Sequence, residues 1–151
     1  MTDPTWVAVG RSGERVELVE LHRDGARSES RVLTRASLTD AVADYERRGV
    51  RWVWSDTRAW YPELIAAGMR VARAHDLRLV HAILRDAAAV RDAAELRAAV
   101  AWDAPPMDAA PVAGPALFDL DEPASRFVPL AIDEVLAEFG RQRAALDAAP
   151  D

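Results

Sequence analysis

The feature that most limits the fold is a pair of short runs rich in Val and Trp, Thr5–Val9 and Val50–Trp54. Runs of this length and composition, bounded by Gly or by helix-starting residues, are typical of buried strands. Segments with helical spacing lie between and after them, so strands and helices alternate along much of the chain. We therefore predict an α/β fold.

The amino-terminal part predicts a hairpin and one further strand. Gly10–Gly13 has the composition of a turn. Arg15–His22 alternates apolar and polar side chains, as a half-buried strand does, and is predicted to pair with Thr5–Val9. Arg31–Thr34 is a candidate third strand.

Helices are predicted where apolar side chains recur at three- and four-residue spacing. The first follows Ser37, a candidate N-cap with Asp40 three residues later, and ends at Gly49. The later predicted elements are a helix over Arg58–Ala67, a short strand over Met69–Ala74, a helix over Leu77–Asp86, a mostly helical stretch over Ala87–Trp102 and a helix over Ala131–Leu146.

Asp103–Pro129 differs in character from the rest of the chain, because it contains six prolines and an acidic patch. Such composition is typical of a linker. The sequence therefore divides into an α/β domain over residues 1–102, a linker over 103–129 and an amphipathic helix within 130–151. The apolar stripe of that helix is predicted either to fold back on the α/β body or to meet a segment further along.

Composition excludes several classes of protein. The chain has no Cys, which excludes disulfides and thiolate chemistry, and no Lys, so its 19 basic residues are all Arg. The net charge of −6 argues against strong autonomous nucleic-acid binding. No apolar run approaches the length of a membrane span, and the start resembles no secretory signal, so we expect a cytoplasmic location.

Five segments together resemble one family: Trp6–Gly10, Val16–Leu21, Val53–Arg58, Glu63–Gly68 and His75–Leu84. They are similar to the proofreading 3'-5' exonuclease domain of DNA polymerase I-like, family A enzymes. The resemblance implies an RNase H-like fold. The family spacing between a helix-ending Gly and the next helix-starting Asp is kept, here as Gly68 and Asp76.

The whole chain resembles the opening of the bifunctional 3'-5' exonuclease/DNA polymerases of high-GC bacteria, in which a linker with a Leu-Phe-Asp signature leads into a helix that begins the polymerase part. Here that signature is Leu117-Phe118-Asp119. The resemblance implies that the helix within 130–151 starts that polymerase region. It also implies a polymerase domain in cis beyond residue 151, with its own Mg²⁺, and contact with DNA through the full-length enzyme. Leu117 and Phe118 also resemble a peptide that docks on sliding clamps, and are candidate partner-binding residues.

The family's nuclease chemistry needs four carboxylates that hold two divalent metals. Val9 and Arg11 occupy the positions of the first pair, and Trp60 that of a further Asp. Asp56 falls on an Asn position, and Asp76 matches a residue that is not a metal ligand. We therefore expect a degenerate exonuclease domain with no catalytic, cofactor-binding or metal-binding residues, which acts as a scaffold; whether the chain counts as an enzyme stays open.

Two other hypotheses remain from the sequence. The chain is alternatively a stand-alone interaction module with the helix over Ala131–Leu146 as its docking element, or a nuclease that uses Asp56 with Asp76 or Asp44. His75 and His81 are six residues apart, which does not suit a metal-binding pair on a helix. Trp52 and Trp54 are expected to pack under a helix rather than to stack on bases.

Overall fold

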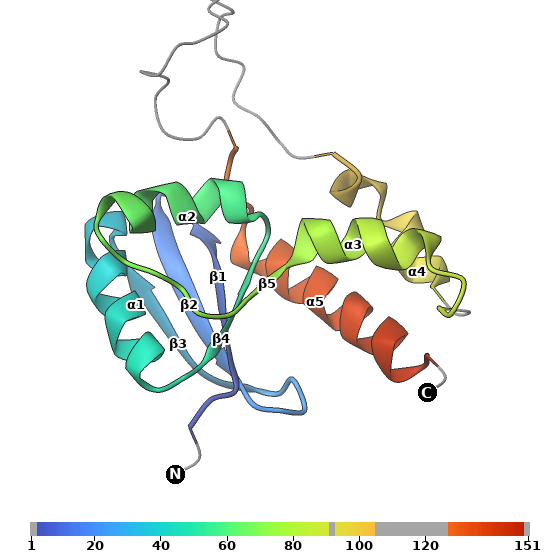
Figure 1. Ribbon diagram of the computed structural model, residues 1–151, viewed down its shortest axis with the longest axis horizontal. Helices are drawn as coiled ribbons and strands as arrows, with labels where there is room; N and C mark the ends of the chain where they lie inside the picture. The colour runs from blue at the N-terminus through green and yellow to red at the C-terminus, as the bar shows by residue number, and fades with distance from the viewer. Residues whose placement is uncertain (1–2, 91–92, 105–126, 150–151) are drawn as a thin grey trace, which may run out of the picture.

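In the computed structural model, which describes residues 3–90, 93–104 and 127–149, a single sheet forms the centre of the fold (Figure 1). Its five strands lie in the order β3-β2-β1-β4-β5. The elements along the chain are β1 Trp6–Ser12, β2 Arg15–Leu21, β3 Arg27–Leu33, the short helix η1 Arg35–Ser37, α1 Leu38–Arg47, β4 Arg51–Trp54, α2 Thr57–Ala66, β5 Ala74–Asp76, α3 Leu77–Asp86, α4 Ala94–Ala98, η2 Val100–Trp102 and α5 Ile132–Asp147.

The sheet is mixed, and the predicted α/β class is confirmed. β1, β2 and β3 form an antiparallel meander, in which Ala8 lies opposite Val19 and Leu18 opposite Arg31. β4 and β5 continue the sheet in parallel with β1. The carboxyl ends of β1, β4 and β5 therefore meet at one edge of the sheet, where α2 and α3 begin.

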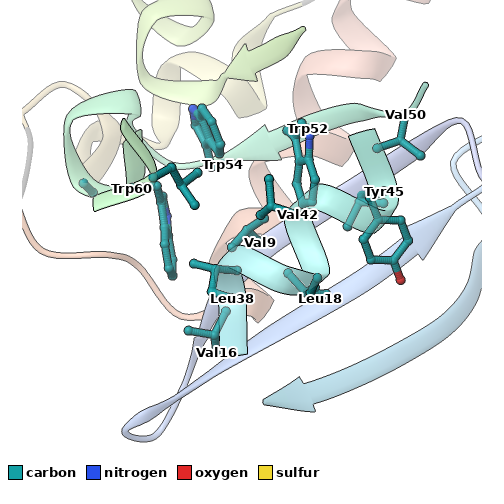
Figure 2. Packing of buried hydrophobic residues seen from close by; sticks show 14 residues of the cluster. Val9, Val16, Leu18, Leu38, Val42, Tyr45, Val50, Trp52, Trp54 and Trp60 are labelled. Atoms are coloured by element: carbon teal, nitrogen blue, oxygen red, sulfur yellow. The ribbon is translucent and has the colours of Figure 1, made fainter. Parts of the chain in front are cut away.

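Strand alternation divides the core between the two faces of the sheet. Val7 and Val9 of β1 face α1 and α2, whereas Ala8 faces α3 and α5. Figure 2 shows the first of these layers, in which side chains of α1 and α2 lie over those of the strands. Near the far end of α5, Leu84, Val90, Leu96 and Ala145 form a smaller cluster that joins α3 and α4 to α5.

Trp52 and Trp54 lie on the same face of β4 and are buried under α1 and α2, as expected. Their indole N–H groups are satisfied, because Trp52 Nε1 donates to Glu46 at 2.7 Å and Trp54 Nε1 to Thr57 at 3.0 Å. Buried indoles usually find such partners, and their large apolar area contributes strongly to a core. These tryptophans therefore serve packing.

The first predicted turn is shorter than expected. β1 continues through Gly10 and Arg11 to Ser12, which pairs with Arg15 across a two-residue connection. Gly13 in this connection has a left-handed backbone, with φ of 60°. The glycine at position 10 has a different purpose, described below.

Three further expectations were wrong in detail. β3 spans Arg27–Leu33 rather than Arg31–Thr34, because an outer strand with both faces exposed needs no apolar alternation. β5 lies at Ala74–Asp76 rather than Met69–Ala74, since the chain forms an irregular link after Gly68 before it reaches β4. Ser37 makes no side-chain cap of α1; its hydroxyl contacts Thr34 instead.

The stretch over Ala87–Trp102 is less helical than predicted. Within its described residues only α4 and the short η2 are helical. α5 begins and ends within a residue of the predicted bounds, and its stripe folds back on the α/β body: Ile132, Val135 and Phe139 are buried against the sheet. None of the helices in the described ranges combines the length and the apolar character needed to cross a bilayer.

Candidate functional site

The carboxyl edge of the parallel strands is the place where open α/β sheets usually bind ligands. Here β4 is followed by Asp56 and β5 ends on Asp76, so two carboxylates arrive side by side at the starts of α2 and α3. A cavity of about 420 Å³ opens at this point. Its lining residues are Asp56, Arg58, Asp76, Arg78, Leu79, Ala82 and Asp103.

Asp56 uses both carboxylate oxygens within the protein. Its Oδ1 accepts from the backbone N–H of Arg58 at 2.9 Å, which caps α2. The Arg58 side chain adds a fork of two bonds, from Nε at 3.0 Å and from Nη2 at 2.8 Å. These hydrogen bonds raise the pKa of the Arg58 guanidinium. Asp56 is also only 4% exposed, so little of it faces solvent.

Asp76 connects two helix starts. Its Oδ1 accepts from the backbone N–H of Leu79 at 3.0 Å, which confirms the predicted cap of α3. Its Oδ2 accepts from the backbone N–H of Thr57 at 2.8 Å, in the first turn of α2. The partial positive charges at the starts of both helices therefore stabilise the negative charge of one carboxylate. Sequence reasoning found the first of these bonds but not the second.

Arg78 is a buried cation at the same edge. It is 7% exposed, its Nη1 donates to the carbonyls of Trp102 and Ala104, and its guanidinium lies over the Trp102 ring. Burial lowers the pKa of Arg78. Its Nε lies 3.5 Å from Asp56 Oδ2, so the buried carboxylate and the buried guanidinium compensate each other.

The charges of the site cancel. The cavity is lined by the negative side chains of Asp56 and Asp76 and the positive side chains of Arg58 and Arg78. The third carboxylate, Asp103, pairs with Arg85 at 2.6 Å. A divalent cation requires uncompensated oxygen ligands. Among the described residues, no group of three or more His, Asp or Glu side chains is arranged to hold a metal ion. The residues present therefore do not fit the metals that a nuclease of this class would need.

The positions that the resemblance assigns to metal-binding acids hold Val9, Arg11 and Trp60, which make other contacts. Val9 is buried in the core under α1 and α2, and Trp60 of α2 belongs to the same core, where Arg35 lies over its ring. Arg11 directs its backbone N–H to Leu130 O at 2.8 Å and its Nε to Pro129 O at 3.4 Å. None of these side chains offers an oxygen ligand.

The chain that leads into α5 crosses the end of β1. Ala131 forms a parallel bridge with Arg11. A Cβ atom on Gly10 would lie 2.4 Å from Ile132 Cα, so this crossing requires glycine. The protein's own backbone thus occupies the space beside the carboxyl end of β1. In the sequence, the glycine at position 10 is the sign of this close approach, but it was predicted to belong to a turn.

A second polar cluster joins β5 and α3 to α5 and was missed by sequence reasoning. His81 Nδ1 lies 2.7 Å from Glu138 Oε1, and His75 Nε2 lies 2.8 Å from Gln142 Oε1. Glu138 and Gln142 are fully buried, and Arg141 also donates to Glu138. The detectable signal was a Glu and a Gln four residues apart on the buried side of an amphipathic helix.

Asp44 does not belong to the candidate site. It lies on α1 and pairs with Arg47 at the surface. Leu117 and Phe118 fall outside the described residues, as does most of the predicted linker.

No protein-family model matches this chain, and comparison with curated proteins and with solved structures finds no significant match.

Proposed function

We propose that this chain is a catalytically inactive, RNase H-like domain that acts as a scaffold for the polymerase part of a family A DNA polymerase. The resemblance in sequence motivates the proposal. The order β1-β2-β3-α1-β4-α2-β5-α3, an antiparallel meander continued by two parallel strands, is compatible with such a fold and supports it. Under this proposal the polymerase domain lies in cis beyond residue 151, in the cytoplasm.

The observation that carries the inactive part of the proposal is the neutral carboxyl edge. Asp56 caps α2 and pairs with Arg58 and Arg78, whereas Asp76 caps α3 and accepts from Thr57, so both carboxylates are engaged in contacts within the protein. The segment before α5 lies against Gly10 and Arg11, at the end of the strand where the family places its first acidic pair. The same contacts that engage these carboxylates also stabilise the fold of the domain, which a scaffold requires.

Under this proposal, Mg²⁺ and the DNA-binding surface belong to the polymerase part. The domain itself would position that part and contact DNA only through the full-length enzyme. Leu117 and Phe118 remain candidates for contact with a sliding clamp. The overall charge of −6 agrees with a domain that does not grip nucleic acid by itself.

One observation favours the alternative of a stand-alone module. α5 buries its apolar stripe on the sheet of this chain, so the described part completes its core without a further domain. The same observation argues against α5 as an exposed docking element, because Ile132, Val135 and Phe139 are not accessible to a partner.

The size of the protein in its own cells separates these two proposals. An immunoblot with an antibody raised against residues 1–100 is expected to detect a band several times larger than 16.6 kDa, as for the front of a polymerase. A band near 16.6 kDa would contradict the scaffold role and support the free-standing module. Size alone leaves the inactivity of the site as a separate question.

A further inference from the structure

The strand β3 forms one border of the sheet and is unusually open. Six of its seven residues are exposed, and its last residue, Leu33, is half-buried. In the part of the chain that the structure describes, its only strand partner is β2. A border strand directs every second N–H and C=O group outward without a ladder partner, which makes it a template for a further strand.

The sequence of β3 is complementary to itself. It reads Arg27-Ser28-Glu29-Ser30-Arg31-Val32-Leu33. When two copies run antiparallel with Ser30 opposite Ser30, Glu29 of each copy lies opposite Arg31 of the other. Directly opposed side chains on an antiparallel pair share a face and lie close, and opposite charges there are stabilising. The pairing therefore contains two equivalent ion pairs.

Backbone geometry and charge together select this register. A shift of one residue would place outward-pointing groups opposite inward-pointing ones, so the hydrogen-bonded ladder would be lost. A shift of two residues places Glu29 opposite Glu29 or Arg31 opposite Arg31, and like charges directly opposed are destabilising. The register centred on Ser30 is also the one that overlaps all seven residues.

We propose that two copies of this chain associate through β3 about a twofold axis at Ser30, which joins their two sheets into one. Such an interface is isologous, since each copy contributes the same surface. The register of β3 against β2 shifts between Val19 and Leu21, opposite Ser28 and Glu29, so the proposed pairing rests on the three residues Glu29, Ser30 and Arg31 around the axis. Charged border strands usually discourage association; here the signs are arranged so that a second copy is favoured.

Sedimentation equilibrium of the full chain tests the proposal. We expect a concentration-dependent equilibrium between 16.6 kDa monomers and dimers. Glu29→Arg and Arg31→Glu, each alone, place like charges opposite each other at both ion-pair positions, and are expected to weaken association about tenfold. An equimolar mixture of these two variants restores both ion pairs between unlike chains, so we expect dimers to return.

Arg27→Glu provides the matched control. It makes the same charge change as Arg31→Glu on the same strand, but Arg27 lies beyond the register shift and outside the two ion pairs, so dimerisation should change little. Urea unfolding of each variant reports separately on its fold, since Arg31 also lies 5.9 Å from the centre of the Tyr45 ring. A wild-type chain that stays monomeric at millimolar concentration, or a mixture that fails to restore dimers, would overturn the proposal. It stands or falls independently of the scaffold role.

Discussion

The backbone N–H of Thr57 donates a 2.8 Å hydrogen bond to Oδ2 of Asp76, across the gap between the start of α2 and the end of β5. One carboxylate thereby fixes two strand-to-helix junctions. The contacts at this edge therefore stabilise the junctions between the strands and the helices that follow them.

Asp76→Ala should destabilise the fold, because it leaves the N–H groups of Thr57 and Leu79 without their acceptor. Loss of a capping carboxylate costs about 1–3 kcal/mol in the free energy of unfolding. Urea unfolding followed by circular dichroism measures it. Asp44→Ala removes an exposed carboxylate on α1 and should cost less than about 0.5 kcal/mol. Equal effects of the two substitutions would refute the double-cap role of Asp76.

Gly10→Ala should loosen the docking of α5. The added methyl group meets the backbone of Ile132, which cannot move as a flexible side chain does. Overpacking of this kind costs about 1–3 kcal/mol. Gly140→Ala is the matched control on α5, because nothing lies within 4 Å of its new Cβ atom and alanine favours a helix over glycine. The account requires opposite signs for the two changes in unfolding free energy.

Glu138→Ala should be among the most destabilising single substitutions on α5. Glu138 is fully buried and accepts from Arg141 and Gln142, besides its contact with His81. Removing one member of a buried charged network costs about 3–5 kcal/mol. Glu134→Ala removes an exposed carboxylate one turn earlier on the same helix. Thermal unfolding of both variants gives the comparison, and a small effect at Glu138 would show that the network contributes little.

The pKa of Tyr45 should lie above that of an ordinary tyrosine. Burial, together with the hydrogen bond that its hydroxyl donates to Glu20 at 2.7 Å, raises the pKa of Tyr45 above the ordinary value of about 10. The folded state then holds the proton after the unfolded state has lost it, so stability falls as pH rises above that value. Ultraviolet absorbance of tyrosinate in wild type and Tyr45→Phe measures the difference. A tyrosinate transition at the ordinary tyrosine pKa that is absent from Tyr45→Phe would contradict the buried contact.

Much of the fold was predictable from local patterns. The hairpin of β1 and β2, the helices α1, α2, α3 and α5, and β4 carry clear periodicity or β-rich runs, and their bounds were predicted within a few residues. β3 was largely missed because a strand exposed on both faces has no apolar alternation to detect. The position of β5 depends on pairing with β4, which no local signal encodes.

The residue types of the candidate site were more predictable from the sequence than the contacts between its residues. The caps Asp56 and Asp76 follow from the usual residue types at helix starts, and Trp60 in the core was expected. The bond from Thr57 to Asp76, and the crossing of Gly10 by Ile132, join segments far apart in sequence. Such contacts are fixed by tertiary structure, so a single sequence gives no spacing from which to infer them.

The central claim is that the carboxyl edge has no nuclease chemistry. Incubation of the purified chain with end-labelled single-stranded DNA and Mn²⁺ tests this claim most directly, with Asp56→Ala and Asp76→Ala variants prepared in parallel. The account predicts intact DNA in all three samples. Degradation by the wild type that disappears in both variants would contradict the account, whereas degradation that persists in both would identify a contaminating nuclease.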